Sequence, residues 1–221
     1  MRMLNRGGVL NVPNVSFVDE DSSVRYLLEL DPYNGHEYID LGLPSGLKWA
    51  TCNVGATSPE QAGLYFAWGE TTGYTANDVT SGVRVFREDA YNAGPAASIS
   101  ADLTIEQDAA HVNLGGNWRM PTREEFNELR YNTTHTWTTD YNGTGVKGYI
   151  VTSKTNGKSI FLPAAGDGDG SHVYNVGEWG FYWSASWESS SNAYRLEFHP
   201  SEFYTARYTR RYGCPVRGVC E

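Results

Sequence analysis

The carboxy-terminal third of the chain alternates apolar and polar side chains, and this pattern constrains the fold more than any other feature. From Gly148 onward, the alternating runs are separated by turn-forming sequences such as NG, GDGDG and SSSN. Successive side chains of a strand point to opposite faces of a sheet, so a period of two predicts strands that pair as antiparallel neighbours. The predicted strands are YIVTS, KSIFLP, FYWSAS, AYRLEFH and GVC.

Helix signals occur earlier in the chain, where a hydroxyl residue is followed three positions later by Glu or Gln. Such segments start at Ser58, Thr104 and Thr122. The last predicts the clearest helix, because Phe126 and Leu129 follow it at helical spacing, and the other two are expected to be short. Short helices early and a twisted antiparallel sheet late predict an α+β fold.

The predicted domain organisation has two parts. Residues 38–221 contain no boundary rich in Pro, Ser or charge, so they are expected to form one domain. Residues 1–37 are expected to form an amino-terminal β extension with a strand pair near 15–18 and 24–30, which could pack on the main domain or on a neighbouring chain as a homo-oligomer contact. Residues 71–99 show no sustained period and are expected to form a long loop.

Composition and charge argue against several classes of partner and cofactor. The net charge of −9 disfavours bulk attraction to nucleic acid, and no apolar run approaches the roughly 20 residues of a membrane-spanning helix. Three cysteines are too few for a disulfide scaffold, and the five histidines lack metal-ligand spacing. We therefore expect no cofactor, no metal and no membrane insertion.

The segment from residue 194 to 212 carries the features of a recognition surface. In the strand that starts at Tyr194, the apolar side chains alternate with Arg195, Glu197 and His199, which are then expected to face outward. Residues 203–212 interleave tyrosine with arginine, two types enriched at binding hot spots, although a merely solvated strand face remains an open alternative.

Charge arithmetic predicts that this surface is locally basic. Residues 195–221 contain five Arg and three Glu, giving +2, which leaves −11 for the first 194 residues. Such a patch would suit an anionic or sugar-bearing partner, since Arg can hold a carboxylate or phosphate in a bidentate grip. Arg210 and Arg217 are exceptions, expected to be buried and paired with acids or carbonyls. The predicted ligand-binding residues are Trp187, Glu188, Asn192, Arg195, Glu197, His199, Tyr204, Arg207, Tyr208, Arg211 and Tyr212.

Other motifs favour structural roles. The run Asp167-Gly-Asp-Gly170 invites a calcium site, but it lacks a following Glu at the calcium-loop distance, and a plain turn is the favoured interpretation. Trp118 is expected to fill the core, and Thr122 to cap a helix. Ser184 lacks a nucleophile-elbow context.

A family resemblance covers about residues 38–221. The runs DLGLPSGLKWATCNVGAT, YFAWGET, GGNWRMPT, IFLPAAG, FYWSAS, AYRLEF and VRGVC resemble the Fibrobacter succinogenes major paralogous domain, which belongs with C-type-lectin-like folds of the formylglycine-generating-enzyme type. The resemblance implies a secreted or surface binding module, and some members are similar to the variable proteins of diversity-generating retroelements. It implies that these residues form a fixed frame: Tyr182, Trp183, Ser184, Ser186, Ala193, Tyr194, Leu196, Phe198, Arg210, Gly213, Val216, Arg217 and Val219.

The resemblance also bears on the cysteines. The enzymatic relatives use a carboxy-terminal cysteine pair, whereas Cys214 and Cys220 lie six positions apart, which is about 20 Å along a strand. Because the fold brings its first and last strands together, a bridge between Cys52 and Cys220 is the expected arrangement, with Cys214 unpaired.

Three functions follow as hypotheses. The first is a non-enzymatic module that binds a cell-surface protein or glycan through the variable segment of about residues 183–215. It would act on a phage virion or at a bacterial cell surface. The start of the chain lacks the apolar stretch of a secretory signal, which slightly favours the phage form. The alternatives are an oxidoreductase of the formylglycine-generating type with a copper site, and a structural adhesin-associated domain.

Overall fold

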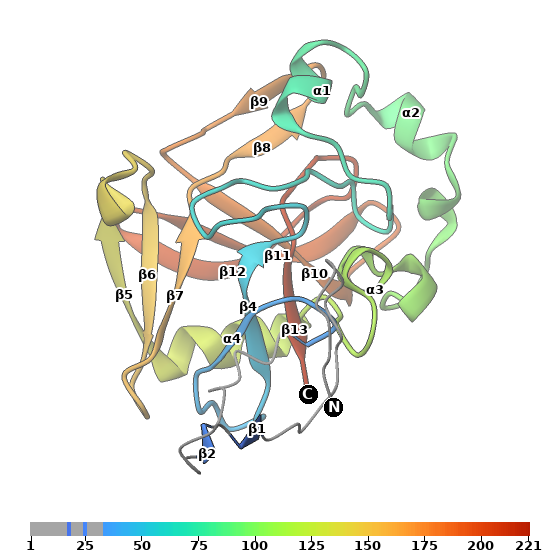
Figure 1. The fold of residues 1–221 in the computed structure, drawn as a ribbon. Coiled ribbons are helices and arrows are strands. Elements are labelled where there is room, and N and C mark those ends of the chain that lie inside the picture. The colour runs from blue at the N-terminus through green and yellow to red at the C-terminus, as the bar shows by residue number, and fades with distance from the viewer. Residues whose placement is uncertain (1–16, 19–23, 26–32) are drawn as a thin grey trace.

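The computed structural model describes residues 17–18, 24–25 and 33–221, which form a mixed α+β structure of short helices and antiparallel sheets (Figure 1). This confirms the predicted α+β class. None of the described helices is long and apolar enough to cross a membrane. The helices are α1 (Ala76–Thr80), α2 (Glu88–Asn92), α3 (Ala109–Leu114) and α4 (Arg123–Asn132), with 3-10 turns at Pro95–Ser98, Ile105–Gln107 and Tyr141–Gly143.

The described strands form five small sheets rather than one continuous sheet. Two-stranded pairs are β1 (Phe17–Val18) with β2 (Val24–Arg25), and β8 (Asp167–Asp169) with β9 (His172–Tyr174). Three-stranded sheets are β5 (Thr133–Thr138), β6 (Gly148–Ser153) and β7 (Ser159–Pro163); β13 (Arg217–Cys220), β4 (Lys48–Asn53) and β3 (Tyr38–Asp40); and β10 (Gly180–Trp187), β11 (Asn192–His199) and β12 (Glu202–Thr209).

The sheet β10-β11-β12 has an apolar layer on each side. Tyr182, Leu196 and Phe198 belong to one buried cluster, together with Phe126 and Leu129 of α4. Phe181 and Trp183 alternate with these residues along β10 and belong to a second cluster. Because successive strand residues face opposite sides, a strand that is covered on both sides must bury nearly every side chain.

The helix predicted at Thr122 is confirmed. Oγ1 of Thr122 accepts from the amide of Glu125, and the Glu125 carboxylate accepts from the amide of Thr122, which is the reciprocal capping arrangement that starts α4. The signal at Ser58 was misleading, since residues 57–61 form only a turn, in which Gln61 instead accepts from Thr57. The signal at Thr104 starts a 3-10 turn of three residues, which leads into α3.

The expectation of a long loop over residues 71–99 is wrong. This segment contains α1, α2 and the 3-10 turn Pro95–Ser98. The guanidinium of Arg210 holds the end of the segment, donating to the carbonyl oxygens of Ile99 at 2.7 Å, Ala96 at 3.0 Å and Ala97 at 2.9 Å. The structure of this segment therefore depends on a side chain 111 residues away, which the local pattern of apolar residues could not indicate.

The first and last strands of residues 38–221, β3 and β13, lie in one sheet but do not pair directly, because β4 lies between them. In the pairing of β13 with β4, Val219 is opposite Trp49 and Arg217 is opposite Asn53. Trp118 is fully buried, which confirms its predicted core position. Near the amino terminus, β1 and β2 agree with the expected strand pair, but most of residues 1–37 lie outside the described residues. The division into an extension and one domain stays a prediction, as does an oligomer contact.

Candidate functional site

The expected outward face of β11 is in fact buried. Arg195 is 2% exposed and Glu197 is 7% exposed, so the prediction that both face solvent is wrong. The carboxylate of Asp167, on β8, lies 3.6 Å from Nη1 of Arg195, and Sγ of Cys214 lies 3.5 Å from the same nitrogen. The β8–β9 pair and the β12–β13 connection thus add a further layer over this face.

Arg195 occupies the centre of a ring-lined ionic cluster. Its guanidinium carbon lies 4.0 Å from the ring centre of Phe181 and 3.5 Å from that of Tyr208, while Nε donates to Glu197 at 2.7 Å. Burial raises the pKa of Asp167, and the nearby Arg195 partly offsets this effect. Two rings and two carboxylates therefore hold the guanidinium in one position.

The cluster continues outward into half-buried tyrosines. The hydroxyl of Tyr204 donates to Glu197 at 3.0 Å, and the rings of Tyr208 and Tyr212 meet edge to face at 4.7 Å. Burial raises the pKa of Tyr204 and that of Tyr208 to about 12, so both hydroxyls stay protonated near neutral pH and can donate. We call this set the tyrosine–arginine band: Arg195, Glu197, Tyr204, Tyr208, Arg211 and Tyr212.

The far end of the band is Arg211, which is also paired. It donates to Asp169 through Nη1 and to the Tyr212 hydroxyl at 2.9 Å, and it lies 3.5 Å from the Glu88 carboxylate. The backbone positions it, because Gly168 and Gly213 exchange two hydrogen bonds of 2.7 and 2.9 Å against the ring of Phe86. A Cβ on either glycine would come within 2.5 Å of that ring, so this close approach requires glycine.

Two shallow hollows include residues of the band in their linings. One, of about 500 Å³, is lined by Arg211 and Asp169 together with Arg87, Glu88 and Asp89. The other, of about 340 Å³, is lined by residues 201–204 and by Arg130 of α4, which packs on the opposite face of the sheet from Arg195. Binding surfaces are often concave and flanked by rigid aromatic side chains.

The positive charge predicted for residues 195–221 is neutralised in the folded chain. Arg195 faces Asp167 as well as Glu197, and Arg211 faces Asp169 and Glu88. Arg207 lies 3.5 Å from Glu188. Arg210 and Arg217 are buried against backbone carbonyls, as expected. A positive sequence stretch therefore does not become a positive surface, because the acids that neutralise it come from elsewhere in the chain.

Five other predicted site residues lie away from the band, and four of them are near the β10–β11 turn. Trp187, Glu188 and Asn192 surround the β10–β11 turn, where the amide of Glu188 donates to the carbonyl of Asn192 at 3.3 Å. Arg207 is opposite Tyr194 in the strand register, so it projects from the other face of the sheet than Tyr208 does, and its side chain is 71% exposed.

His199 belongs neither to the band nor to the group at the β10–β11 turn. It lies at the opposite end of β11 from Asn192. Seven residue steps divide them, which is about 23 Å at the usual rise of a strand. The His199 ring lies 4.2 Å from that of Trp179, and its Nε2 lies 3.3 Å from Glu202. The predicted single patch is therefore three groups of residues.

Asp167 and Asp169 belong to strand β8 rather than to a plain turn, which corrects the favoured sequence interpretation. Both carboxylates already face arginines, Arg195 and Arg211. Nothing in the sequence marks these pairs, because the partners lie 28 and 42 positions apart. Within residues 33–221, no group of three His, Cys, Asp or Glu side chains is placed to hold a metal ion.

The cysteines do not form the expected bridge. Cys52, Cys214 and Cys220 are all free, and the register sets Cys220 opposite Lys48, four positions from Cys52. Cys214 and Cys220 are fully buried, and burial raises the pKa of Cys214 to about 12 and that of Cys220 to about 11. Neither thiol is suited to act as a nucleophile, because the reactive form is the thiolate.

Alkylation should separate the three thiols. We expect iodoacetamide at neutral pH to modify only the half-buried Cys52 in the native protein, and all three cysteines after unfolding, with adducts counted by intact mass. A Cys52→Ser variant should then give no native adduct. Alkylation of Cys214 or Cys220 in the folded protein would contradict this expectation and would favour thiol chemistry near the carboxy terminus.

One protein family matches this chain. It is described as a domain of unknown function (DUF8237), and the match covers residues 133–219, from β5 to β13. The match includes the whole tyrosine–arginine band but spans less than half of the 221 residues. No curated protein and no solved structure matches the chain.

Proposed function

We propose that this chain is a non-enzymatic recognition module that binds a cell-surface protein or glycan through the tyrosine–arginine band. The observation that carries the proposal is the support beneath Tyr204 and Tyr208. Tyr204 donates to Glu197, Tyr208 covers Arg195, and Glu197 and Arg195 are buried and paired to each other. Aromatic side chains held in one conformation lose little entropy on binding, which is a property of strong contact residues.

The proposal includes a C-type-lectin-like fold related to the Fibrobacter succinogenes major paralogous domain, acting on a phage virion or at a bacterial surface. What supports it is the buried state of the residues that the resemblance assigns to the frame, such as Tyr182, Trp183 and Val219. If the segment is diversified, the tolerant positions are the half-buried 204, 206, 208 and 212, and not the buried 195 and 197.

The ion pairs of the band also bear on the kind of partner. Arg195 and Arg211 already face four acidic side chains: Glu197, Asp167, Asp169 and Glu88. A strongly anionic partner would have to displace these carboxylates, and each displaced acid would then lose its own cation. The band therefore suits a neutral partner that stacks on its rings.

A double substitution tests the proposal. Tyr204→Ala with Tyr212→Ala should weaken binding of the labelled protein to bacterial cells and to a glycan array by about tenfold or more, as expected for hot-spot rings. Wild type must first bind at least one cell type or glycan in the same assay, and no binding to either would overturn the proposal.

Matched controls keep the test sharp. Tyr131 and Tyr174 are exposed tyrosines outside the band, so replacing both with alanine should leave binding unchanged. The thermal midpoint of both double variants should stay within a few degrees of wild type. Equal binding by the band variant and the control variant would mean that the band is not the contact surface.

A further inference from the structure

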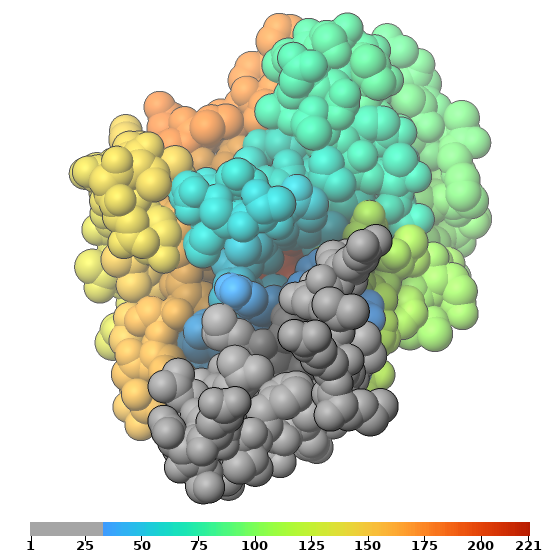
Figure 2. Space-filling model, viewed as in Figure 1, coloured from blue at the N-terminus to red at the C-terminus, as the bar shows by residue number. Residues whose placement is uncertain are grey.

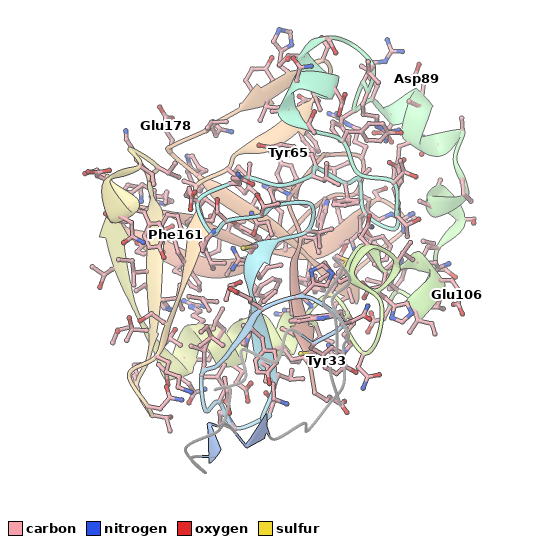
Figure 3. The ribbon with its side chains drawn as sticks, in the orientation of Figure 1. Tyr33, Tyr65, Asp89, Glu106, Phe161 and Glu178 are labelled. Atoms are coloured by element: carbon pink, nitrogen blue, oxygen red, sulfur yellow. The ribbon has the colours of Figure 1, made fainter. Side chains whose placement is uncertain are left out.

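Another hollow lies away from the band, between the β5–β6–β7 sheet and the end of β11. It has a volume of about 410 Å³ and is lined by Trp137, Lys147, Glu178, Trp179, His199 and Pro200, among others. In Figure 2 the yellow segment around residue 145 lies beside the orange segment around residue 175 at the left edge of the molecule. Figure 3 shows Glu178 at that same edge. We call this hollow the tryptophan cleft.

Both tryptophan rings are held by packing. Trp179 stacks on Phe181 at 5.7 Å and 11°, and Trp137 meets Tyr149 edge to face at 5.2 Å. The hydroxyl of Tyr149 donates to the carbonyl of His199 at 3.0 Å, which ties the two walls together. Rings that are both half-buried and fixed in this way do not have to reorganise when a ligand arrives.

The loop that carries Glu178 and Trp179 is also fixed. Asn175 and Gly177 adopt φ of 62° and 77°, and the amides of Glu178 and Trp179 both donate to the carbonyl of Asn175, at 3.0 and 2.9 Å. The amide of Gly177 donates to the carbonyl of Ala164 at 2.7 Å. A turn with two left-handed residues and these bonds gives Trp179 a defined position.

The cleft has polar groups with no assigned partner. Among the described residues, neither indole nitrogen of Trp137 and Trp179 has a hydrogen-bond acceptor, and neither Lys147 nor Glu178 takes part in an ion pair (residues 33–221). Side chains of both charges thus stand at the rim of an aromatic hollow, together with donors that nothing in this part of the chain uses.

The geometry points to a binding site for a single sugar ring, within a glycan, in the tryptophan cleft. The C–H bonds on one side of a pyranose carry partial positive charge and can lie on the electron-rich face of an indole, as edge-to-face aromatic pairs do. The ring hydroxyls can donate to Glu178 and accept from Lys147 and the indole N–H groups. A quaternary ammonium ligand would also suit two indoles, but Lys147 and Glu178 offset each other's charge, so the rim as a whole does not favour a cation.

This site is separate from the tyrosine–arginine band and does not depend on the function proposed for it. Saturation-transfer NMR tests it, with the methyl glycosides of glucose, galactose, mannose, fucose and N-acetylglucosamine, and with choline as a comparison. We expect transfer to the ring C–H protons of at least one glycoside, reduced about tenfold or more in Trp137→Ala with Trp179→Ala. No transfer to any of the five, or equal transfer in that variant, would overturn the inference, as would transfer to choline alone.

Further variants guard against loss of folding. Lys147→Ala and Glu178→Ala change exposed side chains, so each should reduce sugar binding severalfold with no change in the thermal midpoint. Unchanged binding in both would overturn the assigned rim contacts. The band variant Tyr204→Ala with Tyr212→Ala should bind the glycosides as wild type does, which separates failure of this site from failure of the band.

Discussion

Replacing Arg217 with alanine should lower the free energy of unfolding by about 3 to 5 kcal/mol. The side chain is fully buried, and its guanidinium donates to the carbonyl oxygens of Ala50 at 2.8 Å, Thr51 at 2.7 Å and Phe161 at 2.9 Å, and to Oδ1 of Asn53 at 2.9 Å. Alanine would leave these acceptors without their donor and would leave a cavity where β4 meets β7. Urea denaturation at neutral pH measures the change.

Two variants calibrate that result. Arg217→Lys keeps the charge but cannot span four acceptors, so its loss should be intermediate. Arg87→Ala removes an exposed arginine that lies 3.5 Å from Asp89, and it should change stability by about 0.5 kcal/mol or less. A loss below about 1 kcal/mol for Arg217→Ala would show that the buried guanidinium does not hold these strands together.

Replacing Arg195 with methionine should cost a similar amount, about 3 to 5 kcal/mol, for an electrostatic reason. Methionine fills much of the space between Phe181 and Tyr208, but it leaves the carboxylates of Asp167 and Glu197 buried without their cation. Burial already raises the pKa of Asp167, and loss of Arg195 removes the charge that opposes this effect.

The sign of the pH dependence follows from that shift. A carboxyl whose pKa is higher in the folded state than in the unfolded state takes up protons on folding, so it favours folding at low pH and opposes it as the pH rises. Arg195→Met should therefore be more stable at pH 5 than at pH 7, as measured by thermal melts. A variant that also carries Asp167→Asn and Glu197→Gln should recover most of the loss and show little of this dependence. If the triple variant does not regain stability, the loss in Arg195→Met comes from packing and not from charge.

Local patterns in the sequence predicted five strands after residue 147, missed others such as β4, β5 and β12, and predicted poorly which side chains face solvent. Period-two alternation located β6, β7, β10, β11 and β13, and the capping residues Thr122 and Glu125 located the start of α4. The same alternation assigned Arg195 and Glu197 to solvent. The assignment failed because a further layer, β8–β9, covers that face, and which face receives such a layer depends on residues distant in the chain.

The candidate site was predicted in part. Tyrosine and arginine enrichment pointed to Tyr204, Tyr208 and Tyr212, which the fold brings together with Arg195 and Arg211. Enrichment could not indicate that Asp167 and Asp169 neutralise those arginines, and it missed Trp137 and Trp179, which come from segments about 40 positions apart. A cleft whose two walls come from distant segments leaves no local signal.

The pairing of β4 with β13 sets an order for the folding of this protein. Strand β4 ends at residue 53, and its partner begins 164 positions later, so that pairing cannot form until most of the chain is available. During synthesis, Trp49 and its neighbours must wait until residue 220 has left the ribosome, and contacts of such long sequence separation form slowly. Until then, the apolar side chains around β4 stay exposed on the nascent chain, where chaperones can bind them.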